Sequence, residues 1–399
     1  MLYLTNPVRH YDWGSATIIP DLLGISPDGS PHAELWMGAH PDDPSHVLVR
    51  GRDRRLDELI ADDPEWVLGP SDSKRFAGRL PFLLKVLAVE APLSLQVHPD
   101  AGRARRRYDE EAASGFPEAE RAYRDPFPKP ELICALTDFH VLCGFRPPEE
   151  SAALLVGLVD AQLPWLIEAL RAGAPGDSLR RVVERLLTLD AADASTAVAA
   201  LGAACEERLT AGSPCEDLDR TVAELASRYP GDRGVLVAAL MHRRTLRAGQ
   251  AAFLDAGVAH AYLHGVGVEV LAASDNVVRG GLTSKRVDIP ELLEVLNVGP
   301  QPDPVMDPVS TDGNRWSYPV PVESFSLERL STTAGMTQHV PGGRARLLFV
   351  AEGEVVARVG NEQVVVGRGQ SVLVTAAEPD AYLTGAGLVF VAAPGHTQR

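Results

Sequence analysis

Residues 81–98 read PFLLKVLAVEAPLSLQVH, two apolar runs separated by an Ala-Pro turn. Runs of this length and composition are typical of β-strands. In the second run, Ser94, Gln96 and His98 alternate with apolar residues. Because successive side chains of a strand point to opposite faces, these three polar side chains share one face. The stretch therefore predicts a sheet that carries polar groups on one side.

Sequence of β type extends on both sides of this stretch. Residues 1–50 are short extended pieces broken by turns, and strand patterning returns after about residue 230. Residues 322–399 contain short valine-rich segments with glycine turns, typical of a small β-barrel or jelly roll. A basic helix is expected over about 100–124, and an extended proline-rich linker over 299–321.

A helical block interrupts this β sequence. Five apolar residues in it follow the i, i+3, i+4, i+7, i+8 spacing of one helix face: Leu179, Val182, Val183, Leu186 and Leu187. We therefore predict a mainly β protein with a helical insertion. Its expected domains are a first β domain of residues 1–148 and 230–318, a helical subdomain of residues 149–229, and a C-terminal β domain of residues 319–399.

The composition limits the partners of the chain. Its 399 residues include 38 Lys and Arg against 54 Asp and Glu, a formal net charge of −16. Such a surface repels nucleic acid and anionic membranes, so we expect neither as a partner, and an anionic substrate needs a local basic pocket. Four cysteines make no disulfide framework, and we see neither a secretory leader nor the roughly 20 apolar residues of a membrane span. We expect a cytoplasmic protein.

Four residues are candidates for a divalent metal site. Gln96 and His98 share a strand face, and Glu131 and His260 occur in later β-type segments. A divalent metal ion needs several nitrogen or oxygen ligands that converge on one point. Each residue alone also fits a structural part: a polar strand face for the first pair, a capping carboxylate for Glu131, and a buried core histidine for His260. Their spacing does not choose between these interpretations.

Five blocks of sequence carry a family resemblance. They are AELWMGAHP at 33–41, PLSLQVHPD at 92–100, KPE at 129–131, HAYL at 260–263 and SDNVVRGGLTSK at 274–285. Together they resemble the type I mannose-6-phosphate isomerases of the cupin superfamily. The resemblance implies that the first β domain is a catalytic cupin (jelly roll) and that the C-terminal domain is a second jelly-roll-like unit. It also implies one zinc ion per chain, held by Gln96, His98, Glu131 and His260.

The activity that the resemblance implies is interconversion of D-mannose 6-phosphate and D-fructose 6-phosphate through a cis-enediol, which feeds GDP-mannose synthesis. Arg279 matches the family's active-site arginine, and a guanidinium suits a phosphate or a developing enediolate. Lys85, Ser94 and Lys285 match positions that line the family's pocket, although both lysines could also be ordinary surface residues. Asp275 lies in the same block as Lys285 and is expected to bind substrate.

The base that moves a proton between C1 and C2 is left open. Glu269 matches a pocket glutamate of the family, and burial on an apolar strand would raise its pKa toward the useful range. Lys129, two residues before Glu131, and a metal-bound water are the alternatives.

Two features depart from the family or from its metal site. Many members have a histidine before the KPE triplet, where this chain has Pro128. This motivates one alternative, a zinc-dependent isomerase of another sugar or sugar phosphate. A second alternative, a non-catalytic sugar-binding cupin, is also kept open. The C-terminal domain has only His339 and His396, so we expect it to bind no metal. The expected partner is a small sugar phosphate, and a monomer is favoured.

Overall fold

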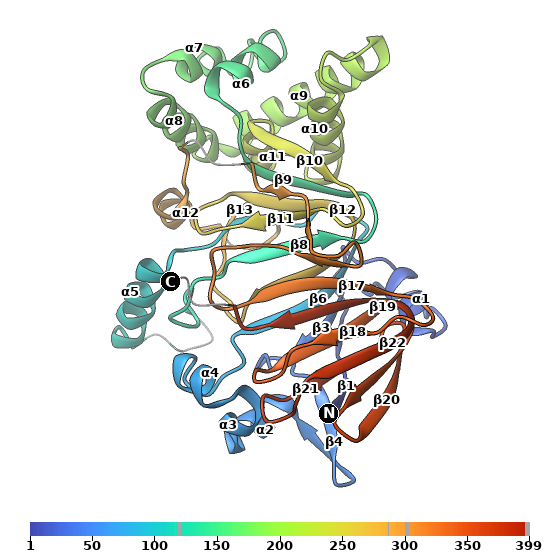
Figure 1. The fold of residues 1–399 in the computed structure, drawn as a ribbon. Helices are drawn as coiled ribbons and strands as arrows, with labels where there is room; N and C mark the ends of the chain where they lie inside the picture. The colour runs from blue at the N-terminus through green and yellow to red at the C-terminus, as the bar shows by residue number, and fades with distance from the viewer. Residues whose placement is uncertain (116, 118–120, 286, 300–302, 396–399) are drawn as a thin grey trace.

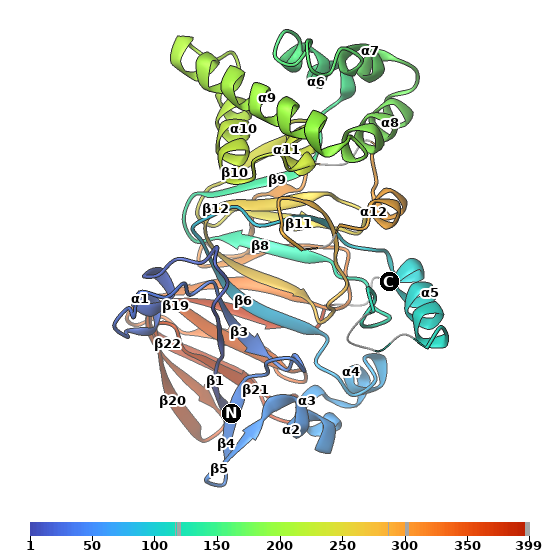
Figure 2. The same cartoon turned by 180° about the vertical axis from the view of Figure 1, so that it is seen from behind.

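The computed structural model describes residues 1–115, 117, 121–285, 287–299 and 303–395. Two antiparallel β-sheets form the body of the molecule, and a group of helices covers one end (Figure 1). Seen from behind, the strands of one sheet lie between this helical end and the other sheet (Figure 2). The prediction of a mainly β protein with a helical insertion is confirmed.

The sheet nearer the helices is called the first sheet. Its central path runs in the order β14-β11-β8-β12-β6-β3-β2; off this path, β7 and β9 pair with β12, β13 pairs with β7, and β10 pairs with β9. Its described strands are β2 (Val8–Arg9), β3 (Glu34–Gly38), β6 (Phe82–Val89), β7 (Leu95–Val97), β8 (Glu131–Ala135), β9 (Phe139–Phe145), β10 (Met241–Leu246), β11 (Ala251–Leu254), β12 (His260–Ala272), β13 (Val278–Gly281) and β14 (Val305–Met306).

The second sheet follows the order β15-β16-β17-β22-β19-β21-β1-β4-β5. Its described strands are β1 (Leu2–Thr5), β4 (His46–Val49), β5 (Arg52–Arg55), β15 (Val309–Ser310), β16 (Arg315–Ser317), β17 (Ser326–Thr332), β18 (Gln338–Val340), β19 (Arg346–Val359), β20 (Glu362–Gly367), β21 (Ser371–Val374) and β22 (Ala381–Ala393).

Strands from the two ends of the chain pair in the second sheet. Leu4 of β1 lies opposite Ser371 of β21 on one side and Val47 of β4 on the other. The expected linker over 299–321 also contains short paired strands, β14 to β16, within its described part. The division at residues 148, 229 and 318 stays a prediction.

Strand β6 shows how the sequence builds two environments at once. All of its residues are buried. Phe82, Leu84 and Val86 point toward the second sheet and pack in one core with Phe349 and Phe390. The alternate residues of β6, which include Lys85, point away from the second sheet. The same alternation in β3, β8 and β12 places Glu34, Glu131 and Glu269 on that side.

Six of the twelve described helices, α6 to α11, lie between β9 and β10, where the helical insertion is expected, and the predicted apolar face of α8 is buried. The described helices are α1 (Ile18–Leu23), α2 (Leu56–Asp62), α3 (Pro64–Leu68), α4 (Pro70–Arg75), α5 (Ala101–Ala113), α6 (Pro148–Leu155), α7 (Leu166–Arg171), α8 (Pro175–Leu187), α9 (Ala191–Ala211), α10 (Glu216–Arg228), α11 (Arg233–Ala238) and α12 (Ile289–Val295). Among them no single helix is long and apolar enough to cross a membrane; α8 and α9 pass that test only as a pair bent by 110°.

The helix expected over 100–124 is shorter than predicted. It begins after Asp100, whose side chain accepts the backbone N–H of Arg103, and α5 ends at Ala113. Gly115 then adopts a left-handed φ of 78°, which an α-helix does not continue through, and Pro117 lacks the N–H that a further turn needs. Residues 116 and 118–120 of that prediction lie outside the described part.

Candidate functional site

A cavity of about 760 Å³ opens on the face of the first sheet that points away from the second. Strands β3, β6, β7, β8, β12 and β13 supply its walls, together with residues of the segments at 121–129 and 272–285. Most of the predicted site residues line it: Lys85, Ser94, Gln96, Lys129, Glu131, Glu269, Asp275, Arg279 and Lys285. His98 and His260 are fully buried beside it.

His98, Glu131 and His260 converge on one point. Each offers a ligand atom, and the three atoms lie within 4.8 Å of one another. His98 Nε2 is 3.2 Å from Glu131 Oε1, and His260 Nε2 is 3.5 Å from Glu131 Oε2. His98 Nε2, His260 Nε2 and Glu131 Oε2 are buried without a hydrogen-bond partner among the described residues. Unsatisfied buried polar atoms are costly, so three at one point indicate a site for a cation.

The other ring nitrogens fix the orientation of the two histidines. His98 Nδ1 lies 2.8 Å from the carbonyl oxygen of Asn276, and His260 Nδ1 lies 2.9 Å from that of Val258. A carbonyl oxygen only accepts, so each Nδ1 carries the proton and each Nε2 presents a lone pair to the cluster. This is the arrangement that metal-ligating histidines show.

The charges of the cluster favour a cation as well. Burial lowers the pKa of His98 to about 4, despite the attraction of Glu131. Burial opposes ionisation of Glu131, but His98 and Lys129 beside it hold its pKa well below the usual range. At neutral pH the cluster therefore presents a carboxylate and at least one neutral imidazole.

Gln96 lies on β7 directly beside this cluster. In the ladder it is opposite His260 of β12 on one side and Arg279 of β13 on the other. Its side chain is half-buried and lines the cavity. The position suits a further oxygen ligand, and its part in metal binding stays a prediction.

Another wall of the cavity carries a cluster of buried acidic and basic side chains. Lys85 Nζ lies 3.4 Å from Glu34 Oε2 and 3.6 Å from Glu269 Oε2, above the ring of Trp36. The Tyr262 hydroxyl donates to Glu269 Oε1 at 2.9 Å. Burial raises the pKa of Glu269 to about 7. The negative charge of the nearby Glu131 adds to this increase in pKa, and the positive charge of Lys85 opposes it. Burial would lower the pKa of Lys85, but Glu34 and Glu269 outweigh it and keep the ammonium charged.

A further part of the cavity is cationic. Arg279 is half-buried there, and Lys285 and Arg124 are exposed at its edge. Burial lowers the pKa of Arg279 and of Lys285, and their cationic neighbours lower both further. A protein of net charge −16 thus has a basic pocket where an anion can bind.

Comparison with known proteins agrees with this geometry. Residues 1–148 match the family model of the phosphomannose isomerase type I catalytic domain. Mannose-6-phosphate isomerase of Salmonella typhimurium is 36% identical over 395 residues, with 97% of this chain and 98% of the relative covered. The Homo sapiens enzyme is 31% identical over 403 residues, covering 91% and 90%. A crystal structure of the Salmonella typhimurium enzyme bound to substrate (f6p) and zinc has a TM-score of 0.91 at 35% identity, covering 99% of this chain and 100% of that one.

The chain belongs to the type I phosphomannose isomerase family. The family resemblance and the mainly β fold class with two jelly-roll-like units are thereby confirmed. Pro128 of this chain stands where many family members have a histidine. Hydrogen bonds from Asn276 and Ser274 hold its segment in place. Asn276 donates its side-chain amide to the carbonyl oxygens of Asp125 and Phe127, and Ser274 donates its hydroxyl to the Asp125 carboxylate.

Several cavity residues were missed from the sequence. His40 is 5% exposed, and its Nε2 lies 3.3 Å from Asp275 Oδ1. The AELWMGAHP block held a signal for Glu34 and Trp36, because period-two alternation places both on the side of Lys85. Nothing local marked Arg124 or Glu291, which reach the cavity only through the fold.

Proposed function

We propose that this protein is a zinc-dependent aldose–ketose isomerase that interconverts D-mannose 6-phosphate and D-fructose 6-phosphate. The observation that carries the proposal is the meeting of three unpaired, buried ligand atoms beside a cavity with a cationic end. A sugar phosphate bound in the cavity could place its sugar against this cluster while the cationic side chains hold its phosphate. Relatives that cover nearly the whole chain are mannose-6-phosphate isomerases.

The ligand set fits zinc. His98 and His260 offer imidazole nitrogens, Glu131 a carboxylate, and Gln96 an amide oxygen from the neighbouring strand. One carboxylate among neutral ligands leaves the ion with net positive charge. When bound, one zinc ion per chain polarises an oxygen of the sugar and so acidifies the neighbouring C–H group.

The charges orient the substrate. A phosphate is repelled by Asp275, Glu131 and Glu269, so we assign it to the end of Arg279 and Lys285. Arg279 can form a two-pronged contact with phosphate oxygens, while Lys285 supplies a point charge. Ser94 and Asp275 also line the cavity and can form hydrogen bonds with sugar hydroxyl groups.

Glu269 is the base that we favour for proton transfer between C1 and C2. A pKa of about 7 lets a carboxylate both accept and return a proton near neutral pH. Tyr262 and Lys85 hold its two oxygens in place, so the direction of the carboxylate is fixed. Lys129, with Nζ 3.4 Å from Glu131 Oε1, is held close to the metal ligands and stabilises negative charge on the substrate.

We also propose that the protein works in the cytoplasm, as a monomer, and supplies the precursor of GDP-mannose. Its four cysteines are free, which suits a reducing compartment. Pro128 concerns one part of this proposal, the preference for mannose 6-phosphate over other aldose phosphates.

A coupled assay that follows fructose 6-phosphate tests the proposal. We expect turnover of mannose 6-phosphate, its loss with a chelator, and its return with added zinc. Turnover of another aldose phosphate but not of mannose 6-phosphate would support an isomerase of a different sugar. Binding of sugar phosphates without turnover of any would support a non-catalytic cupin.

A further inference from the structure

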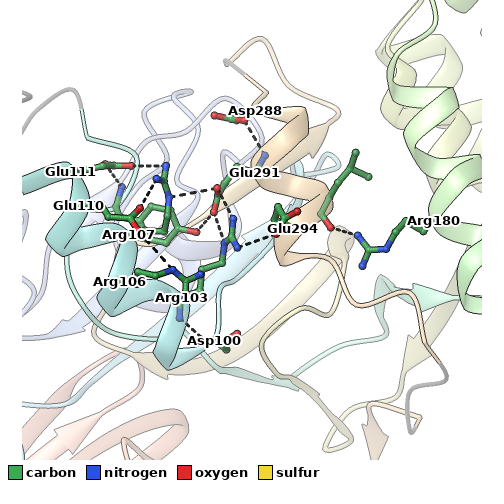
Figure 3. A network of polar contacts seen from close by, with 12 residues as sticks. Asp100, Arg103, Arg106, Arg107, Glu110, Glu111, Arg180, Asp288, Glu291 and Glu294 are labelled. Carbon is green, nitrogen blue, oxygen red and sulfur yellow. Dashed lines mark hydrogen bonds and ion pairs between the residues drawn. The ribbon is translucent and has the colours of Figure 1, made fainter. Parts of the chain in front are cut away.

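Glu291 of α12 is a buried carboxylate at the edge of the cavity, and the proposed reaction gives it no part. Figure 3 shows the network around it. Arg103 of α5 donates from Nε to Oε1 at 2.7 Å and from Nη2 to Oε2 at 2.8 Å. Tyr123 donates its hydroxyl to Oε1, and Arg107 Nε lies 3.6 Å from Oε2. One carboxylate therefore joins α12 to α5 and to the segment at Tyr123.

The elements joined by Glu291 carry or support the cations of the cavity. Arg124 directly follows Tyr123. Lys285 lies in the segment that leads into α12. Strand β13, which carries Arg279, packs against the same helix: a Cβ added at Gly280 would lie 3.2 Å from Leu292 Cδ2. A shift of α12 relative to α5 would thus change the distances between all three cations.

These cations repel one another, because they share the edge of one cavity. Arg124 lowers the pKa of Arg279, and both arginines lower that of Lys285, after the larger effect of burial in each case. The chain beneath them must therefore be fixed before an anion binds. Arg180 of α8 adds to this, since it donates to the carbonyl oxygens of Leu293 and Leu296 and so holds the end of α12.

We propose that Glu291 is a positioning residue for the phosphate end of the cavity. It neutralises Arg103 and holds α5, Tyr123 and α12 together, so that Arg124, Arg279 and Lys285 are in place before the substrate arrives. This inference rests on the proposed function, because the phosphate is that of the sugar substrate. Fixing the cations in advance reduces the ordering cost of binding, so the effect falls on affinity and not on proton transfer.

The test compares Glu291→Gln with Glu294→Gln in the zinc-loaded enzyme. Glu294 lies on the same helix and also pairs with Arg103, at 3.4 Å, but its side chain is 69% exposed. We expect Glu291→Gln to raise the KM for mannose 6-phosphate and the inhibition constant of inorganic phosphate each about tenfold, with kcat within about twofold. Glu294→Gln should leave all three within about twofold of the wild type. Equal effects of the two changes, or a lower kcat at unchanged KM, would overturn the proposal.

A second variant covers the case in which Glu291→Gln does not fold. Tyr123→Phe removes one hydroxyl from the network and should raise KM about threefold without a change in kcat, since it deletes one hydrogen bond to a charged group. An unchanged KM in that variant would count against the proposal. If the wild type does not convert mannose 6-phosphate at all, the proposed function fails. Calorimetry with inorganic phosphate then still decides on Glu291, because weaker binding to Glu291→Gln supports its positioning role and equal binding refutes it.

Discussion

The two sheets share one core but use their other faces differently. Each turns one face toward the other sheet, where Leu84 of β6 and Phe349 of β19 lie in the same apolar cluster. On its far face the second sheet is filled with aliphatic side chains such as Leu348 and Val350. The first sheet places Lys85, Glu131 and Glu269 there, beside a smaller apolar cluster that includes Leu87 and Ile133. The same period-two alternation thus builds a packed interior in one unit and a reaction site in the other.

Buried polar and charged side chains have different surroundings in the two units, that is, in the first sheet and the second sheet with the segments packed on each. Arg346 of the second unit is 2% exposed, and its guanidinium donates to backbone carbonyl oxygens, including those of Pro341 and Thr375. It is a satisfied structural group. In the first unit, His98 and His260 each keep one nitrogen without a described partner. Single unsatisfied atoms also occur elsewhere, as at Arg329 Nε of β17, so the functional interior is distinguished by the gathering of three such atoms at one point.

Removal of a metal ligand is expected to have the largest effect and tests the functional role of the first unit. We expect His260→Ala to lose bound zinc and to lower kcat/KM by at least about a thousandfold, because the Lewis acid leaves with its ligand. His264→Ala, on the same strand but exposed, should keep both zinc and activity. Metal analysis and the coupled assay measure the two effects. Stoichiometric zinc in His260→Ala would refute the ligand assignment.

Removal of the base tests the acid–base wall of the first unit. Glu269→Gln should lower kcat by about a thousandfold with little change in KM, as expected for the loss of a general base. Glu328→Gln, in the second sheet and paired with Arg315, should leave kcat unchanged. Should Glu269→Gln keep its activity while Lys129→Met loses it, Lys129 is the base.

A cavity in the second unit should affect stability and not chemistry. Leu348 is 2% exposed on β19, and Leu348→Ala should lower the free energy of unfolding by about 3 kcal/mol through lost burial and an unfilled space. Leu48→Ala on β4 is the control, since that side chain is 73% exposed and should change stability by less than about 0.5 kcal/mol. Urea denaturation measures both. A loss of bound zinc in folded Leu348→Ala would show that the two units are not independent in this respect.

The smallest expected effect is a pH dependence of the folding stability of the metal-free protein. Folding raises the pKa of Glu269 from its usual 4.5 to about 7, so the folded state binds this proton more tightly than the unfolded chain. Stability from this group is therefore present at low pH and is lost as pH rises through that interval, by about 2 kcal/mol between pH 5 and pH 7. Stability curves of wild type and Glu269→Gln should diverge by that amount. Parallel curves would mean that Glu269 titrates normally.

Much of the fold and of the site could be predicted from local sequence. The run at 81–98 predicted strands β6 and β7, and the apolar spacing in α8 predicted its buried face. The predicted length of α5 was wrong, because the prediction extended the helix past Gly115, whose left-handed backbone does not continue an α-helix. The pairing of β1 with β21 could not be foreseen, since a strand of four residues does not specify a partner 370 residues away.

By itself the sequence determined which side chains have the chemistry of metal ligands, and that Gln96 and His98 share a strand face, because period-two alternation and side-chain chemistry are local properties. Tertiary structure decided what these residues meet. It left the Nε2 atoms of His98 and His260 unpaired, set the pKa of Glu269 by burial, and brought Glu291 against α5. Such properties depend on distances and desolvation created by distant segments, and a local pattern does not contain them.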